Sequence, residues 1–122
     1  MRPSRLIAAA VAAVAAALVL AGCASAEPVA LPADTVVIDV RTPEEYAAGH
    51  LDGAQLIDVQ DPGFADAVGQ LPRDGHYLVY CRSGNRAGGA VAIMQDLGFT
   101  DVTNVGGIDA ASSTTGLPVV TG

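Results

Sequence analysis

The residues most able to do chemistry in this chain lie between Cys81 and Arg86. They read Cys-Arg-Ser-Gly-Asn-Arg, which puts one thiol and two guanidinium groups in a short polar loop. An apolar run over residues 77–80 precedes the thiol, and a stretch with helical spacing begins at Asn85. Free N–H groups and the dipole at a helix start stabilise a thiolate or a bound anion. The segment therefore predicts a reactive cysteine.

The cysteine count supports this interpretation. The chain has two cysteines, Cys23 and Cys81. If Cys23 is the site of a lipid anchor, Cys81 is the one thiol left to the domain, without an intrachain disulfide partner in an oxidising compartment. It is then a nucleophile or a sulfur carrier. A free cysteine is commonly a small buried apolar residue, but the polar residues 82–85 argue against a wholly apolar environment.

The N-terminal residues have the pattern of an export signal. After a basic start, residues 6–20 form an unbroken apolar run that is shorter than the ~20 residues of a spanning helix. The run ends in Leu-Ala-Gly-Cys, which resembles the bacterial lipobox. We expect residues 1–22 to be removed, Cys23 to be lipidated, and the protein to be anchored to a membrane outside the cytoplasm. The alternative is an ordinary signal peptide with an incidental Cys23.

The charge balance excludes some classes of partner. Residues 23–122 contain four arginines, no lysine and thirteen acidic residues, a formal charge of −9. This charge argues against nucleic acid and anionic lipid surfaces as partners. We also expect the protein to be a monomer. Arg82 and Arg86 place two of the four arginines in the Cys81 loop of an otherwise acidic domain. This local positive charge indicates a site for an anion.

Strands and helices alternate after a linker. Residues 23–34 are rich in small residues and proline and predict a linker, which leaves residues 35–122 as the domain. The predicted strands are residues 35–40, 54–57, 77–80 and 102–105; the predicted helices are residues 43–48, 62–70 and 85–97; residues 116–120 are extended. This order predicts an open, mostly parallel α/β sheet with helices on both faces. In such sheets the ligand site lies at the carboxyl ends of the strands, where Cys81 falls.

Three ordered segments resemble the rhodanese superfamily. Residues 37–54 are similar to its opening signature, residues 79–87 to its active-site loop, and residues 97–108 to its closing segment. The match spans roughly residues 35–121 and is nearest in kind to small exported single-domain rhodaneses of the phage-shock type. Three motifs in order are far more specific than one.

The resemblance implies a sulfurtransferase. Cys81 would take a sulfane sulfur from a donor such as thiosulfate and pass it from a persulfide to cyanide or a thiol. Backbone N–H groups of residues 82–86 would cradle the sulfur, and Arg82 and Arg86 would bind the donor anion and the departing sulfite. No metal or organic cofactor is required. The expected substrate-binding residues are Arg82, Ser83, Gly84, Asn85 and Arg86.

Other positions match the family without an expected catalytic role. Asp39 and Arg41 are interpreted as supporting residues near the site, and His50 as a hydrogen-bonded support in a turn. The family's usual opening helix and strand are missing, so the fold should be trimmed at its N-terminal side and of modest stability. An aromatic residue usually follows the Gly-Gly-Ile turn, whereas residues 109–112 read Asp-Ala-Ala-Ser. That change leaves the pocket wall and the substrate preference open.

Two alternatives to a sulfurtransferase follow from the loop. A Cys-dependent phosphatase or arsenate reductase needs five residues between its Cys and Arg, whereas Cys81 and Arg86 are separated by four. The shorter loop suits a single sulfur atom better than phosphate. A rhodanese-like domain can also serve as a non-catalytic binding module or as a persulfide carrier, and the carrier uses the same intermediate as the enzyme.

Overall fold

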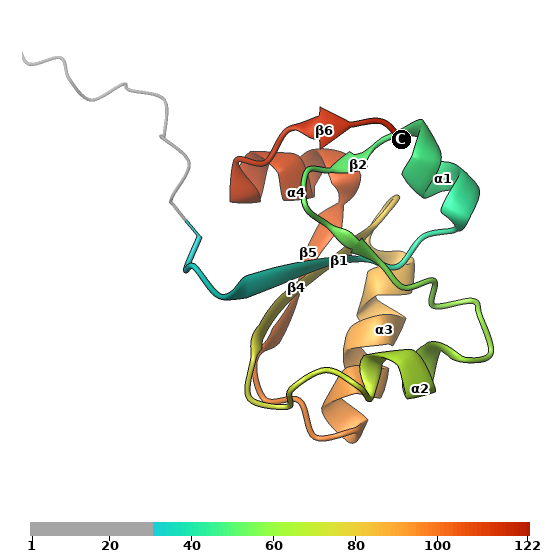
Figure 1. Ribbon diagram of the computed structural model, residues 1–122, viewed down its shortest axis with the longest axis vertical. Coiled ribbons are helices and arrows are strands. Elements are labelled where there is room, and N and C mark those ends of the chain that lie inside the picture. Colours follow the sequence, from blue (N-terminus) through green and yellow to red (C-terminus); the bar gives the residue numbers. More distant parts are fainter. Residues whose placement is uncertain (1–30) are drawn as a thin grey trace, which may run out of the picture.

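The computed structural model describes residues 31–122 (Figure 1). The predicted signal at residues 1–22, the lipidation of Cys23 and most of the linker at residues 23–34 lie outside these residues. Within residues 31–122, no helix is long and apolar enough to cross a membrane.

A four-stranded parallel sheet carries the fold, in the order β3-β1-β4-β5. The strands are β1 (Thr35–Asp39), β3 (Gln55–Leu56), β4 (His76–Cys81) and β5 (Val102–Gly107). The central strands β1 and β4 are rich in β-branched and aromatic residues and largely buried, as strands covered on both faces are. Strands β2 (His50–Leu51) and β6 (Val119–Val120) form a separate antiparallel pair.

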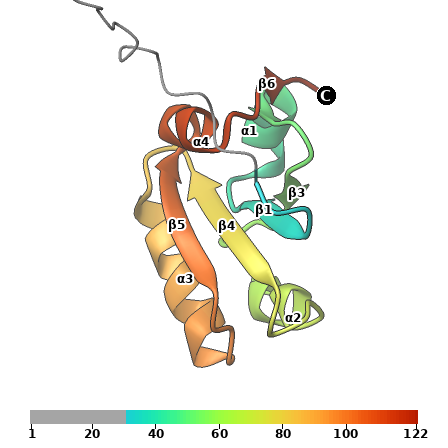
Figure 2. The same ribbon diagram turned by 90° about the vertical axis from the view of Figure 1, so that its left-hand side faces the viewer.

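Helices cover both faces of the sheet, which confirms the predicted fold class (Figures 1 and 2). Helices α2 (Phe64–Val68) and α3 (Asn85–Asp96) pack on one face in a core that includes Ile38, Val79 and Met94. Helix α4 (Ile108–Thr115) lies on the other face, over a core that includes Leu78 and Tyr80. Helix α1 (Pro43–Ala48) lies beside β2.

The structure corrects two predictions for helices. Helix α2 is shorter than the predicted residues 62–70, since it begins after Gly63 and ends before Gly69. Helix α4 was not predicted at all. Its serines and threonines are weak helix formers, and its N-terminus has no side-chain cap. Burial of Ala111 and Thr115 and a hydrogen bond from Thr115 Oγ1 to the Ala111 carbonyl (2.8 Å) stabilise it instead.

Helices α1 and α3 are tied together through Glu45. Thr42 caps α1, and Glu45 returns to the Thr42 backbone N–H, so the predicted capping box is present. The same carboxylate accepts two hydrogen bonds from Arg86 at the start of α3, at 2.8 and 2.9 Å. This bidentate pair lowers the pKa of Glu45 to about 2. One side chain therefore fixes the start of both helices.

The first prediction concerns α3, which positions the Cys81 loop. A Cβ at Gly89 would meet nothing within 4 Å, and alanine loses less backbone entropy on folding than glycine. We expect Gly89→Ala to raise the free energy of unfolding by about 0.5–1 kcal/mol in urea titrations. Gly98→Ala is the matched control, because Gly98 has a φ of +102°. It should destabilise the fold, and equal effects of the two variants would contradict this account of α3.

The second prediction concerns Glu45→Gln, which keeps the cap of α1 but removes the charge that pairs with Arg86. Because the folded pKa of Glu45 lies below the unfolded value of about 4.3, its stabilisation is present above that value and is lost as pH falls toward 2. The two side chains are 24% and 27% exposed, so we expect a cost of about 1 kcal/mol at pH 7.

The measurement is urea unfolding of Glu45→Gln and wild type from pH 7 to pH 2. The difference between them should shrink as the pH falls. Glu44→Gln is the control, because this neighbouring residue is exposed and forms no ion pair within residues 31–122. A difference for Glu45→Gln that stays constant with pH would show that its charge does not stabilise the fold.

Candidate active site

Cys81 ends strand β4, and its thiol is held by the loop that follows. The backbone N–H of Gly84 donates to Cys81 Sγ at 2.8 Å. Gly84 has a φ of +100°, a conformation that L side chains rarely adopt. This residue turns the chain from β4 into α3 and aims its own N–H back at the sulfur. Cys81 itself has no exposed surface.

The N-terminus of α3 adds further donors beside the thiol. No side chain caps this helix, which has twelve residues. The first N–H groups of a helix have no partner inside it, so those of Asn85 to Ala87 lack an acceptor within α3. Asn104 of β5 supports the loop by donating to the Gly84 carbonyl at 3.1 Å. The arrangement offers negative charge on Sγ both hydrogen-bond donors and the positive end of a helix dipole.

A glycine on the neighbouring strand lets the loop close. Gly107 of β5 is the Cα partner of Cys81. A Cβ at Gly107 would collide with the carbonyl oxygen of Arg82 and would lie 3.2 Å from the Cα of Ser83. Any larger residue at this position would push the loop away from β5. The close approach explains why the end of β5 carries no side chain beside the thiol.

The two loop arginines have different surroundings. Arg86 is bound to Glu45, and this hydrogen bonding is the main reason that its pKa is raised. The charge of Glu45 adds to the effect, with smaller contributions from Cys81 and Asp58. Arg82 is exposed and forms no ion pair in the described part of the chain. Arg82 is therefore free to meet an incoming anion, whereas Arg86 already has a carboxylate partner.

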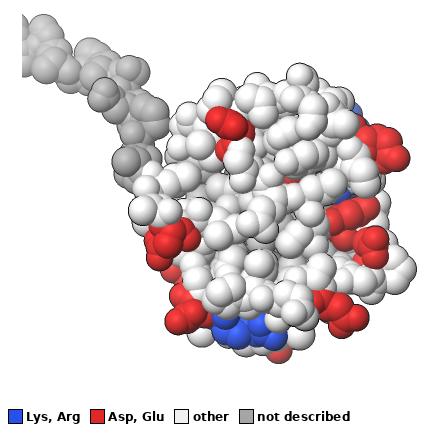
Figure 3. Space-filling model, viewed as in Figure 1, with Lys and Arg blue, Asp and Glu red and all other residues white. Residues whose placement is uncertain are grey.

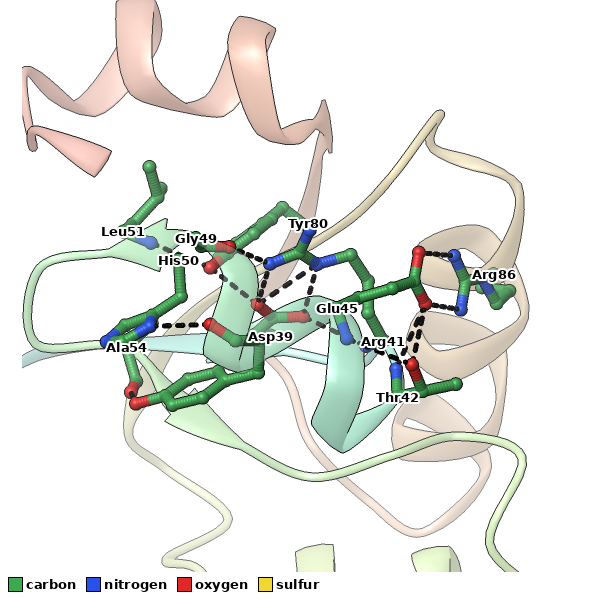
Figure 4. A network of polar contacts seen from close by, with 11 residues as sticks. Asp39, Arg41, Thr42, Glu45, Gly49, His50, Leu51, Ala54, Tyr80 and Arg86 are labelled. Atoms are coloured by element: carbon green, nitrogen blue, oxygen red, sulfur yellow. Dashed lines mark hydrogen bonds and ion pairs between the residues drawn. The ribbon is translucent and has the colours of Figure 1, made fainter. Parts of the chain in front are cut away.

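A buried carboxylate organises the floor of the site (Figure 4). Asp39 accepts hydrogen bonds from Arg41 Nε and Nη2, the latter at 2.7 Å, and from the Tyr80 hydroxyl at 2.8 Å. The same hydroxyl accepts from the backbone N–H of Leu51 at 2.9 Å. Arg41 also donates to the Gly49 carbonyl at 2.6 Å. Through Tyr80, the residue before Cys81, the network joins β4 to β1 and β2.

The pKa values in this network keep its proton arrangement fixed. Burial, followed by the hydrogen bond and charge of Asp39, raises the pKa of Tyr80 far above its usual value. The hydrogen bond to Asp39 raises the pKa of Arg41 despite the opposing effect of burial. Tyr80 therefore remains a hydroxyl donor and Arg41 a cation over the whole physiological range. His50 was predicted in a turn but is the first residue of strand β2. Its ring stacks on Tyr46 with centroids 3.7 Å apart, and its Nδ1 contacts the Tyr46 carbonyl.

A pocket of about 360 Å³ opens at this end of the sheet. Ala48, Ile108 and Val119 form its apolar wall. Ala111, in the segment where the family's aromatic residue is missing, lies instead in the core with Leu51. Ala111 therefore does not line the pocket. The charged residues that line the pocket are Arg41, Glu45, Arg82 and Asp109.

The structure places most of the expected residues together. Cys81, Gly84 and the start of α3 form the loop, Arg82 lines the pocket, and Asp39 and Arg41 form the floor. Ser83 and Asn85 are exposed at the loop surface. No group of three or more possible metal-ligating side chains occurs within residues 31–122.

Sequence reasoning missed four residues that shape the site. They are Glu45, Tyr80, Gly107 and Asp109. Glu45 was visible as a capping residue, but nothing local indicated that it binds Arg86 across 41 positions. The Gly106-Gly107 pair was a signal for a close approach of backbones. Tyr80 and Asp109 gave no local signal, because their roles depend on contacts between distant segments.

Comparison with known proteins places this geometry in a family. A family model described as a rhodanese-like domain matches residues 26–114. The "Thiosulfate sulfurtransferase PspE" of Escherichia coli is 35% identical over 71 residues, which cover 58% of this chain and 68% of that protein. The "Probable adenylyltransferase/sulfurtransferase MoeZ" of Mycobacterium tuberculosis is 39% identical over 75 residues, 61% of this chain. The match spans only 19% of MoeZ.

A solved structure agrees with the sequence relatives. The structure described as a rhodanese with anions from E. coli has a TM-score of 0.59 and 33% identity, and the match covers 72% of this chain and 99% of that one. The family model covers well over half of the chain and includes the Cys81 loop, the supporting Asp39 network and the turn at Gly107. The chain belongs to the family of rhodanese-like domains.

Proposed function

We propose that the protein is a sulfurtransferase that carries sulfane sulfur as a persulfide on Cys81. The observation that carries the proposal is the N–H of Gly84 aimed at Cys81 Sγ, at the end of β4 and before the uncapped N-terminus of α3. These donors stabilise the thiolate, which is the nucleophilic form. The names of relatives such as PspE, a thiosulfate sulfurtransferase, support the same chemistry.

The first half of the reaction loads the thiol. The Cys81 thiolate attacks the outer sulfur of thiosulfate, a new S–S bond forms, and the old S–S bond breaks with its electron pair on the departing sulfite. The Cys81 persulfide then holds one negative charge on its outer sulfur. Arg82 attracts the donor, and the loop N–H groups stabilise the charge that moves onto the outer sulfur.

The second half unloads the sulfur. A thiophilic acceptor, cyanide or a thiolate, attacks the outer sulfur, and the electron pair returns to Cys81 Sγ. Because Cys81 has no exposed surface, both halves require the loop to shift. Figure 3 shows acidic side chains mainly around the edge of one face of the molecule. The unpaired Arg82 therefore also offsets a negative background that repels anions.

A persulfide carrier is the second candidate. Its specific support is the burial of Cys81, which would protect a persulfide from water and oxidants and slow its turnover. Carrier and enzyme form the same intermediate and differ in rate. The carrier would transfer about one sulfur per chain, whereas the enzyme would turn over many times.

A phosphatase would need space that this loop lacks. Four residues separate Cys81 from Arg86, and Arg86 is already paired with Glu45. A tetrahedral phosphate would have to compete with that carboxylate for the guanidinium. Both features favour sulfur over phosphate.

We further propose that the domain works outside the cytoplasm as a monomer, attached to a membrane by lipid on Cys23. The support is the basic start, the apolar run and the Leu-Ala-Gly-Cys ending of the N-terminal sequence. Lipidation with two or more chains gives stable anchoring. The strong negative charge again disfavours nucleic acid as a partner.

Thiocyanate formation from thiosulfate and cyanide tests the proposed activity. Wild-type protein should form thiocyanate, and Cys81→Ser should lose at least ~1000-fold in rate, since a serine hydroxyl is not ionised near neutral pH. Cys23→Ser is the matched control, because it changes the other of the two cysteines, and it should keep the wild-type rate. Activity that survives Cys81→Ser would refute the nucleophile. Hydrolysis of a phosphate ester without thiocyanate would favour the phosphatase.

The anchor has its own test. Cys23→Ser should move the protein from the membrane fraction to the soluble fraction of an expressing cell, because the lipid is lost while the domain is unchanged. Cys81→Ser is the control and should stay in the membrane fraction. A Cys23→Ser variant that remains attached would contradict lipid anchoring at this residue.

A further inference from the structure

The pocket beside the Cys81 loop contains charges of both signs. It lies at the carboxyl ends of three neighbouring strands, because Arg41 follows β1, Arg82 follows β4 and Asp109 follows β5. Cys81 and Gly107 are partners in the sheet. The pocket residues Arg82 and Ile108 are thus each one step beyond a residue of that pair. A molecule bound here lies one residue along the chain from Cys81, whose buried sulfur it can reach once the loop shifts.

Arg41 offers this pocket a fixed cationic donor. Its side chain is 6% exposed and is held from behind through Nε and Nη2, by Asp39 and by the Gly49 carbonyl. Nη1 forms no hydrogen bond within the described residues 31–122, although Arg41 lines the pocket. A buried guanidinium with one open edge is suited to a carboxylate or another oxyanion.

The other charges fall into a paired and an unpaired group. Glu45 is neutralised by Arg86. Arg82 and Asp109 are exposed and form no ion pair within residues 31–122. The pocket therefore presents one unpaired cation, Arg82, the open Nη1 edge of Arg41, whose charge is paired with Asp39, and one open carboxylate, Asp109. Such a set suits a ligand that carries a cationic group as well as an anionic one, because Asp109 has no ion-pair partner within residues 31–122.

We infer that this pocket selects a small zwitterionic thiol, an α-amino-acid thiol, as the sulfur acceptor, with Asp109 as the residue that determines this preference. Arg41 and Arg82 bind the carboxylate, Asp109 binds the ammonium group, and the apolar wall contacts the short carbon chain. The inference rests on the proposed function and names its acceptor class. The pocket volume of about 360 Å³ lies in the range for small ligands.

The transfer is balanced without any further reagent. The acceptor loses its thiol proton to solvent, and its thiolate sulfur attacks the outer sulfur of the Cys81 persulfide. The bond between that sulfur and Cys81 Sγ breaks, and its electron pair leaves Cys81 as a thiolate. The acceptor departs as a persulfide, so one sulfur moves and nothing is oxidised or reduced overall.

The experiment uses the full chain in detergent, in two stages. First, thiosulfate is added, and formation of the persulfide is followed by two readouts, the sulfite that is released and the mass that is added to the protein. Second, after excess donor is removed, loss of the Cys81 persulfide is timed with L-cysteine, N-acetyl-L-cysteine or L-cysteine methyl ester at equal thiolate concentrations. The second thiol lacks the ammonium group and the third lacks the carboxylate. Because the methyl ester lacks the carboxylate, it tests carboxylate binding by Arg41. It avoids a substitution of Arg41, which would leave the buried Asp39 without its partner.

We expect L-cysteine to unload the wild-type persulfide about tenfold faster than either derivative, the effect of one charged hydrogen bond. Asp109→Asn should remove the advantage of L-cysteine over N-acetyl-L-cysteine and keep its advantage over the methyl ester. Asp66→Asn, which removes an exposed carboxylate on α2 away from the pocket, should change nothing.

Two kinds of result would overturn the inference. They separate failure of the acceptor class from failure of the proposed function. If the persulfide forms but the three thiols react equally, or if Asp109→Asn slows all three alike, the acceptor class is wrong while the proposed function stands. If thiosulfate releases no sulfite and adds no mass, the proposed function fails and the acceptor class fails with it.

Discussion

Asp39 is a carboxylate with no exposed surface, and the site depends on how its charge is satisfied. The backbone N–H and guanidinium of Arg41 and the hydroxyl of Tyr80 donate to it. An uncompensated buried charge costs several kcal/mol, so these partners are held in place. Tyr80 directly precedes Cys81, and its hydroxyl also reaches β2. The charge of Asp39 thereby fixes the end of β4, from which the thiol loop begins, and orients Arg41 toward the pocket.

Local patterns were enough to predict the framework. The β-branched run of β1, the capping box of α1 and the helical spacing of α3 are each determined by neighbours in the chain, and all three are present. Helix α4 was not predictable in this way. Its composition favours other conformations, and its burial over the sheet decides its structure. The two-residue strands β2 and β6 are likewise defined by pairing across the fold.

The candidate site also has a part that local sequence predicts and a part that depends on contacts between distant segments. The loop from Cys81 to the start of α3 was predictable, because a thiol between a strand and a helix is a local arrangement. The division of labour between the two arginines was not. Glu45 engages Arg86 and leaves Arg82 open, a long-range choice that makes Arg82 the available cation. The pocket wall also depends on tertiary structure, since Val119 joins it through the pairing of β6 with β2.

The central claim is that negative charge on Cys81 Sγ is stabilised by the Gly84 N–H and the start of α3, so that Cys81 carries a persulfide. Intact-mass measurement before and after treatment with thiosulfate tests it most directly. The claim predicts the mass of one added sulfur, located on the peptide that contains Cys81 and removed by cyanide. An unchanged mass, or a sulfur found on Cys23 instead, would contradict it.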